Sequence, residues 1–228
     1  MDDNGQPWIA KFPSKSDIIN GTDQAAWEYL AHKLAIDAGI DMATCKIEKI
    51  TGPHHTFFTK RFDRQKNQRI HFASAMTMIN LDQIAVKDHT PSYLDIVEFI
   101  EQSTCTPTHD LKQLWRRIVF YICISNTDDH LRNHGFLLDT KGWRLSPAFD
   151  INPSTEKNGL ALNIDENSND LSLDLAREVG IYFRLNTQQM DAIIEQVLTV
   201  VGHWRAIAQQ IGISNKEQER MAAAFITK

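Results

Sequence analysis

Residues 125–136 read SNTDDHLRNHGF, and this stretch does more than any other to decide the fold. It follows the apolar run IVFYICIS at residues 118–125, so that polar side chains from Asp128 onward stand directly after an apolar segment. A second segment, LSPAFD at residues 145–150, ends in another aspartate. A helix end rarely needs so many charged groups, whereas functional side chains are often carried on loops at the ends of rigid elements. The stretch therefore predicts a functional site.

The spacing within these segments is that of a phosphoryl-transfer site. Asp128 lies five residues before Asn133, which reproduces the Asp-x-x-x-x-Asn spacing of a protein-kinase catalytic loop. Asp150 follows a predicted hairpin and takes the place of the metal-binding aspartate of kinases. All three side chains offer oxygen atoms, and Mg²⁺ on nucleotide phosphates is held through one or two such side chains. The set predicts Mg²⁺-dependent phosphoryl transfer.

Two charged residues near the N-terminus complete the pattern. Lys11 stands on a predicted strand and Glu28 on the next helix, as in the lysine–glutamate pair of kinases. Taken alone, a strand lysine is usually solvated, and Glu28 is equally well explained as a solvated carboxylate. The joint occurrence of these residues, in this order and on these elements, favours the kinase interpretation. Asp129 is expected to be exposed or capping, because two ionised neighbours cannot face one hydroxyl without a raised pKa.

Hydrophobic periodicity predicts a small β-rich part followed by a helical part. The first part contains a strand at residues 7–12, a helix from Thr22 or Asp23 to Gly39, and strands at residues 43–50 and 56–62. After a polar run that ends at Arg69, helical spacing dominates. The expected later elements are a helix with Pro91 at its first position, a helix capped by Thr108, a hairpin over residues 135–150, and helices at residues 172–180, from Thr187 and from Ser214.

These elements predict an α+β fold with two lobes, of the protein-kinase type. Residues 1–65 would form a small, incomplete β-rich N-lobe, and residues 66–228 a mainly helical C-lobe with the catalytic and metal-binding loops.

Composition excludes several other classes of protein. A hydrophobic content of 42% in 228 residues is that of a globular protein, and a formal net charge of −5 argues against a nucleic-acid partner. The N-terminus lacks the apolar core of a signal peptide and no stretch is long enough to span a bilayer, so a cytoplasmic protein without a membrane partner is expected. Three widely spaced cysteines, Cys45, Cys105 and Cys123, are expected to be buried thiols.

Five segments together resemble one known family over nearly the whole chain. They are WIAKFPS (8–14), WEYLAHKLAIDAGI (27–40), FTKRFDR (58–64), NTDDHLRNHGFLL (126–138) and WRLSPAFDINPS (143–154). In these segments the chain is similar to the HipA-like toxin serine/threonine kinases of bacterial toxin–antitoxin systems. The resemblance implies a two-lobed kinase-like fold, ATP and Mg²⁺ as cofactors, a cognate antitoxin as partner, and a protein substrate of the aminoacyl-tRNA synthetase kind.

The resemblance also implies a role for each matched residue. Lys11 would bind the ATP phosphates with Glu28 as its partner, Asp128 would act as catalytic base or orient the hydroxyl, and Asn133 and Asp150 would bind magnesium. The segment 59–62, with Lys60 and Phe62, would be the hinge that receives adenine through its backbone. His130 and Arg132 lie inside the catalytic loop, where Arg132 would offset phosphate charge.

The chain departs from that family before Lys11, which only ten residues precede. Family members carry further strands there, including a loop that covers the phosphates, so a separate polypeptide is expected to supply them. An alternative is a catalytically silent kinase-like module, or a gene remnant, that binds an antitoxin or a partner subunit. A third reading, a metal-dependent phosphoesterase using Asp128, Asp129 and His130, is weaker because two-metal sites usually need more ligands.

Overall fold

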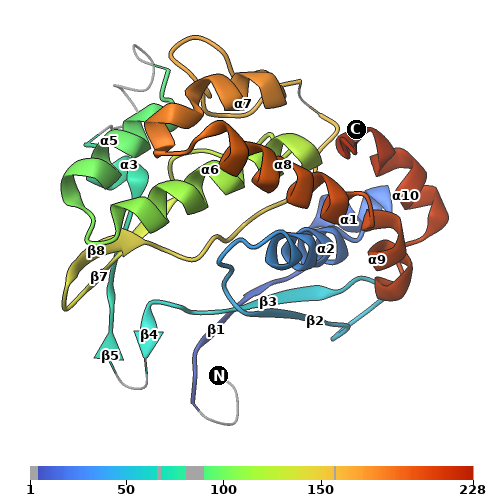
Figure 1. Cartoon of the computed structure of the whole chain (residues 1–228). Coiled ribbons are helices and arrows are strands. Elements are labelled where there is room, and N and C mark those ends of the chain that lie inside the picture. Colours follow the sequence, from blue (N-terminus) through green and yellow to red (C-terminus); the bar gives the residue numbers. More distant parts are fainter. Residues whose placement is uncertain (1–4, 66–67, 81–89, 157, 228) are drawn as a thin grey trace.

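Three antiparallel strands form a first sheet, drawn at the base of the molecule in Figure 1. The computed structural model describes residues 5–65, 68–80, 90–156 and 158–227. The strands β1 (Trp8–Lys11), β2 (Cys45–Glu48) and β3 (Thr56–Lys60) stand in the order β1–β3–β2. All three predicted strands are confirmed. Those on the edges are shorter than predicted, because each pairs with the central β3 over only four residues.

Two helices connect β1 to β2. The first, α1 (Lys15–Asn20), has no counterpart among the predicted elements; it is six residues long and none of them is buried, so it carries no apolar periodicity. The second, α2 (Gln24–Asp37), is the predicted helix and begins after Asp23, whose side chain accepts a hydrogen bond from the backbone N–H of Ala26. Its position brings the Glu28 side chain into hydrogen-bonding contact with Lys11 of β1.

A second antiparallel sheet contains one strand that the sequence pattern does not predict. The predicted hairpin is confirmed as β7 (Gly135–Asp139) and β8 (Gly142–Leu145), and β6 (His71–Ser74) pairs with the other edge of β7. The short strands β4 (Arg64–Gln65) and β5 (Gln68–Arg69) precede β6, and helix α3 (Ala75–Met78) follows it. The sequence of β6, HFAS, shows no apolar alternation, so helical spacing was wrongly expected to begin here.

Helices make up most of the remaining chain, as predicted. They are α5 (Tyr93–Ser103), α6 (Pro107–Ile124), α7 (Leu173–Val179), α8 (Thr187–Val201), α9 (Trp204–Ile211) and α10 (Asn215–Met221), with the short 3-10 helices η1 (Gly180–Phe183) and η2 (Ala222–Ala224).

Several helix starts differ from those predicted. α5 begins after Ser92, so Pro91 precedes its cap. α6 begins with Pro107 at its first position and Thr106 as cap, two residues before the predicted cap at Thr108. α8 is capped by Asn186. Helix α9 was not predicted.

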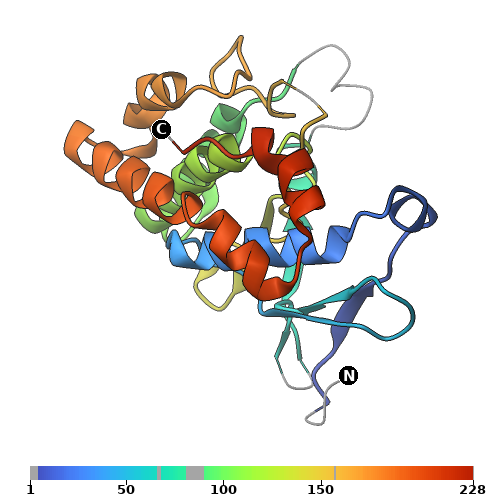
Figure 2. The ribbon, with the colours of Figure 1, turned by 90° about the vertical axis from the view of Figure 1, so that its right-hand side faces the viewer.

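The buried core is continuous from α2 to the C-terminal helices. α6 lies at its centre, with every residue from Trp115 to Val119 buried and Trp115 fully so. α2 contacts β2 and β3 as well as α8 and α9, so it lies between the first sheet and the helical part, as Figures 1 and 2 show. Of the three cysteines, Cys123 is buried, Cys45 is half-buried and Cys105 is exposed, which corrects the expectation for Cys105. Within the described residues, no helix has the length and hydropathy to cross a bilayer.

Candidate functional site

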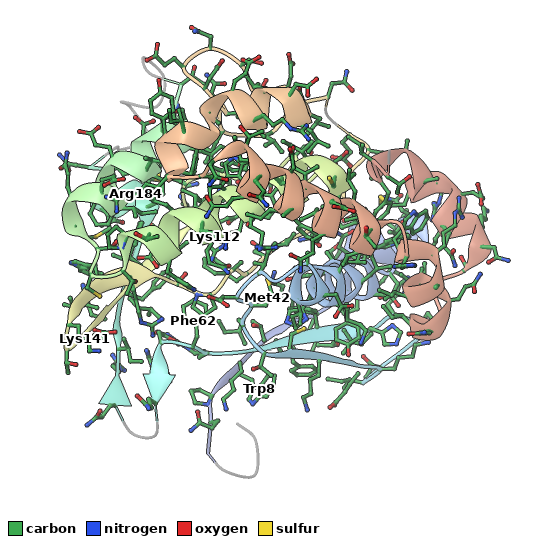
Figure 3. The ribbon with its side chains drawn as sticks, viewed as in Figure 1. Trp8, Met42, Phe62, Lys112, Lys141 and Arg184 are labelled. Atoms are coloured by element: carbon green, nitrogen blue, oxygen red, sulfur yellow. The ribbon has the colours of Figure 1, made fainter. Side chains whose placement is uncertain are left out.

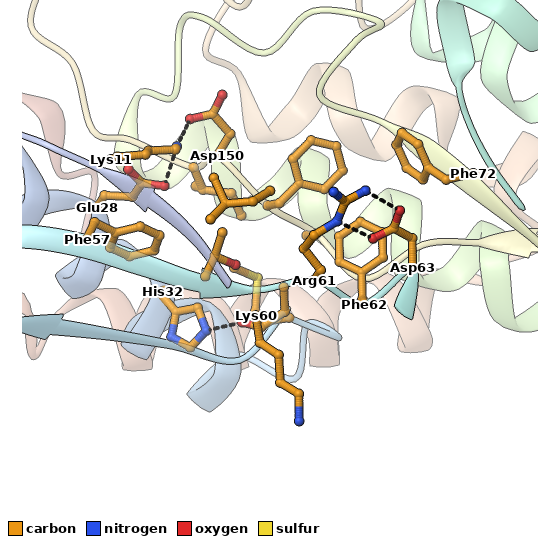
Figure 4. Close-up of a pocket in the computed structure, with 17 residues that line it drawn as sticks. Lys11, Glu28, His32, Phe57, Lys60, Arg61, Phe62, Asp63, Phe72 and Asp150 are labelled. Carbon is orange, nitrogen blue, oxygen red and sulfur yellow. Dashed lines mark hydrogen bonds and ion pairs between the residues drawn. The ribbon is translucent and has the colours of Figure 1, made fainter. Parts of the chain in front are cut away.

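Lys11 joins the first sheet to α2 and to the loop after β8. Its Nζ donates to Oε1 of Glu28 at 2.6 Å and to Oδ1 of Asp150 at 2.5 Å, as the dashed lines in Figure 4 show. The ammonium also lies 5.6 Å from the centre of the Phe57 ring. Residues 17 and 139 positions away in the sequence therefore meet at one cation. The lysine–glutamate pair expected from the sequence is present in the geometry.

Burial sets the ionisation of this group. Burial raises the pKa of Glu28 to about 7, although the ammonium of Lys11 opposes the rise. For Lys11, burial acts to lower the pKa, but the negative charges of Glu28 and Asp150 outweigh it and raise the pKa above 10.5. Lys11 is therefore a permanent cation at neutral pH. An anionic ligand beside it would compete with Asp150, whose side chain is half-exposed.

An apolar cavity of about 230 Å³ extends from this lysine along the first sheet. Lys11, Glu28 and Asp150 lie on one side of it in Figure 4, and Phe62, Phe72 and the Arg61–Asp63 ion pair on the other. Its walls include Ile9, Phe57, Phe149 and Ile151. Met42, another lining residue, and Phe62 are both labelled in Figure 3, between the first sheet and the helices. A flat aromatic ligand suits such walls.

Phe62 and Lys60, the two residues named in the predicted hinge, both line the cavity but face it differently. The Phe62 ring packs against Phe72 and Phe149, each at a centroid distance of 5.7 Å. Lys60 lines the cavity, but its ammonium points away from it in Figure 4. The backbone N–H of Lys60 donates to the carbonyl of Thr44 at 2.7 Å. The Lys60 N–H is therefore already bonded within the first sheet, and its ammonium does not enter the cavity.

The loop after α6 is held in shape by hydrogen bonds of its own. It leaves the helix at Ser125, which has the left-handed φ of 50°. The backbone N–H of Asn133 donates to the carbonyl of His130 at 2.8 Å. The side-chain Nδ2 of Asn133 donates to the carbonyl of Asp128 at 3.1 Å. Because the amide nitrogen is used inside the loop, the amide oxygen is the atom that can bind a cation.

A second, polar cavity of about 640 Å³ brings the predicted acidic and amide residues together. Asp128, Asn133 and Asp150 all line it, and Asp150 also lines the apolar cavity. Asp150 has a left-handed φ of 57°, and the next residue but one, Asn152, is anchored by Gln24 and by Asn126. The two cavities therefore meet at the Asp150 carboxylate. His130 and Arg132 do not line the polar cavity as far as the described residues define it; His130 is half-buried and Arg132 exposed.

Asp129 is fully buried, so the expectation of an exposed or capping residue is wrong. Its Oδ2 accepts hydrogen bonds from the hydroxyl of Tyr93 and from Nε2 of His134, the latter at 2.9 Å. All three side chains are buried. Sequence reasoning missed this cluster: Tyr93 lies 36 residues away, and the only local signal was a histidine five residues after an aspartate.

Several solved structures resemble this fold, including the following two. One is from the toxin–antitoxin complex of Shewanella oneidensis HipA, HipB and operator DNA, with a TM-score of 0.76 and 15% identity, over 95% of this chain and 55% of that one. The other is the Helicobacter pylori proinflammatory kinase CtkA, with a TM-score of 0.67 and 15% identity, over 97% of this chain and 82% of that one. The chain thus spans about half the length of the Shewanella protein. No curated protein sequence matches it.

These similarities confirm the predicted fold class, a kinase-like α+β fold with small sheets and a mainly helical remainder. The family is shown by a sequence model that covers almost the whole chain. The model described as the HipA-like C-terminal domain matches residues 1–220. The chain belongs to the family of HipA-like C-terminal domains.

Proposed function

We propose that this chain is an ATP- and Mg²⁺-dependent kinase that phosphorylates a serine or threonine of a protein. The observation that carries the proposal is the position of Lys11, bridged to Glu28 and Asp150 where the apolar and polar cavities meet. A nucleoside triphosphate has an aromatic base, which suits the apolar cavity, and an anionic phosphate chain, which suits the lysine end. The polar cavity beyond it would receive the acceptor hydroxyl.

The residues at the junction fit a magnesium nucleotide. Asp150 and Asn133 offer one carboxylate and one amide oxygen to the same cavity, which is the number of protein ligands that Mg²⁺ on a nucleotide usually takes. In the described part of the chain, no group of three His, Cys, Asp or Glu side chains could hold a metal ion by itself. The phosphate oxygens of the nucleotide would therefore complete the coordination of Mg²⁺. Bound there, Mg²⁺ would neutralise charge on the phosphates.

The chain's own residues would divide the remaining tasks. Lys11 would bind phosphate oxygens, Asp150 would help to hold the cation, and Glu28 would keep the lysine in place. Asp128 lies exposed in the polar cavity and orients the acceptor hydroxyl. His130 would shape the loop through its carbonyl, which accepts from Asn133, and Arg132, exposed outside the polar cavity, would offset phosphate charge only from a distance. Phe62 and Lys60, which line the apolar cavity, would lie beside the base.

The cellular setting is proposed from the family. The similar Shewanella HipA is solved with HipB and operator DNA, which supports a toxin–antitoxin context and a cognate antitoxin for this chain. We propose a cytoplasmic protein whose substrate is of the aminoacyl-tRNA synthetase kind.

A further strand, from a partner, would bind at the β1 edge of the first sheet. Of the described strands, β1 pairs with β3 alone, and Ile9, which lines the apolar cavity, is 48% exposed. A strand added beside β1 would cover this residue and close the cavity from that side.

The proposal is tested by ligand-induced stabilisation with two variants. Mg²⁺-ATP at a hundredfold excess over its Kd should stabilise the wild type by about 2.7 kcal/mol, and EDTA should remove most of this effect. Asp150→Ala should lose the magnesium-dependent part. Asp128→Asn should keep it, while phosphate transfer to protein falls by about 10²- to 10⁴-fold. Asp174→Asn, an exposed carboxylate on α7, is the matched control. Stabilisation without magnesium dependence, or full transfer by Asp128→Asn, contradicts the proposal.

A further inference from the structure

A buried charge lies directly beside the proposed catalytic loop residues, and the proposed reaction does not use it. The carboxylate of Asp129 has no exposed surface, and its partners Tyr93 and His134 are equally enclosed. Within the described residues, only Oδ2 of Asp129 is hydrogen-bonded, and the buried Oδ1 has no partner. Among the described residues, the carboxylate is therefore held in place by Tyr93 and His134.

Such a group is not explained by stability. Removing a carboxylate from water is costly, and well-packed apolar residues of similar volume often stabilise a core as well or better. The Tyr93 ring packs edge-to-face on His134 at 5.7 Å and the Tyr121 ring lies 6.2 Å from the His134 ring, so aromatic rings make up much of the surroundings. The position of the carboxylate in the loop, next to the proposed functional residues, is a better guide to its role than its effect on stability.

The two loop partners in this cluster are each one residue beyond a proposed functional residue. Asp129 follows Asp128, and His134 follows Asn133. The bond from His134 Nε2 to Asp129 Oδ2, at 2.9 Å, therefore closes the loop across its two ends. Tyr93, at the start of α5, links this hydrogen bond to that helix. The backbone N–H of Tyr93 donates in turn to the carbonyl of Asn163 at 2.9 Å, which fixes the first turn of α5. Beyond His134, the chain enters β7.

The Asp129–His134 hydrogen bond is linked to the proposed magnesium ligand Asn133 through one peptide unit. The Asp128 carbonyl belongs to the peptide that joins it to Asp129, and this carbonyl accepts the bond from Nδ2 of Asn133 at 3.1 Å. Fixing the Asp129 side chain thus fixes the carbonyl that orients the Asn133 amide. The same arrangement, a ligand oriented by a hydrogen bond to a fixed group behind it, tunes metal sites in general.

We propose that Asp129, held by Tyr93 and His134, is a positioning residue that orients the Asn133 amide oxygen toward the cation and holds Asp128 at the acceptor hydroxyl. This inference rests on the proposed function. It adds three residues to the site that touch neither the nucleotide nor the acceptor. Their effect should therefore appear in the response to magnesium and in the rate of transfer, with nucleotide binding in EDTA unchanged.

The test measures the Mg²⁺ concentration that gives half of the ATP-induced stabilisation, together with kcat and KM for transfer. Asp129→Asn keeps the shape of the side chain but loses its charge and is expected to raise that concentration, and to lower kcat, by about 10- to 100-fold. Tyr93→Phe removes one hydrogen bond and should act in the same direction by less. Tyr121→Phe is the matched control, because it removes the hydroxyl of another buried tyrosine beside His134 and should leave both quantities unchanged.

The outcomes separate this inference from the proposed function. A lower melting temperature for Asp129→Asn and Tyr93→Phe, with the magnesium response and kcat of the wild type, would show a structural role alone and overturn the inference. If Asp129→Asn does not fold, Tyr93→Phe decides by the same criterion. If the wild type itself shows no magnesium-dependent stabilisation by ATP, the proposed function fails and the inference with it. A raised magnesium requirement in both variants, with Tyr121→Phe normal, supports it.

Discussion

Lys11 is the residue at which β1, α2 and the loop after β8 meet. Two carboxylates approach its ammonium, one from buried Glu28 and one from half-exposed Asp150. The difference in exposure gives the two partners different roles. Glu28 is enclosed beside the lysine, whereas the half-exposed Asp150 ion pair contributes little to stability, so a contact with the proposed cation could replace it at low cost.

Glu28→Gln should remove a pH dependence of stability. Burial raises the pKa of Glu28 from an ordinary 4.5 to about 7. The folded protein then binds a proton that the unfolded chain releases, so this stabilisation is complete below pH 4.5 and is lost as the pH rises through about 7. Its size corresponds to about 3 kcal/mol. Lys11, with a pKa above 10.5, stays protonated throughout this range.

Urea unfolding near pH 5 and near pH 8 measures this effect. The free energy of unfolding of the wild type should fall across this range relative to that of Glu28→Gln. Glu156→Gln, at an exposed position, serves as control and should follow the wild type. Parallel pH profiles for wild type and Glu28→Gln would show that the Glu28 pKa is not raised.

At the level of secondary-structure elements, the strand that the sequence did not reveal positions part of the apolar cavity. β6 brings Phe72 against Gly135 of β7, and a Cβ on Gly135 would lie 2.2 Å from Cε2 of the Phe72 ring. Phe72 packs in turn against Phe62 and Phe149, at 5.7 and 6.1 Å. The glycine is therefore required by the close approach of this ring.

Gly135→Ala should destabilise the protein by about 1–3 kcal/mol, because the Phe72 ring has to move against its aromatic neighbours. Phe72→Leu in the same chain should recover part of this loss, so that the two changes are not additive in urea unfolding. Gly202→Ala is the control, since its Cβ would meet no atom closer than 3.3 Å among those described. Additive losses in the double variant would mean that the ring does not restrict position 135.

Elements with clear periodicity or caps could be predicted from the sequence, and the others could not. α2, the hairpin β7–β8 and the three strands of the first sheet were found because apolar spacing and turn residues mark them. Asp128, Asn133 and Asp150 were proposed because their spacing is local or follows a hairpin, and all three line one cavity. β6 and the Tyr93–Asp129–His134 cluster were missed because both depend on pairing between distant segments, which no local pattern records.

Across the whole molecule, one buried cluster includes residues on both sides of the lobe boundary that the sequence predicts after residue 65. The boundary after residue 65 remains a prediction. Yet α2, which lies before it, shares one buried cluster with α6 and α8, and its Trp27 lies 6.2 Å from both Trp204 of α9 and Phe225 near the C-terminus. Trp204 and Phe225 stack at 4.3 Å. The helix that carries Glu28 is thus supported by the end of the chain.

This continuity predicts that α2 unfolds together with the helical part. Amide protons of α2 and α8 should exchange through openings of the same free energy in native-state hydrogen exchange. Trp204→Ala should lower the opening free energies of α2 and of α8 by about 3–5 kcal/mol each, because it removes a buried aromatic ring that contacts both α2 and the C-terminal segment. Tyr182→Ala, which removes an aromatic that is 57% exposed, should change neither appreciably. Exchange of α2 through a separate, lower-energy opening that Trp204→Ala leaves unchanged would instead mark residues 1–65 as an independent folding unit.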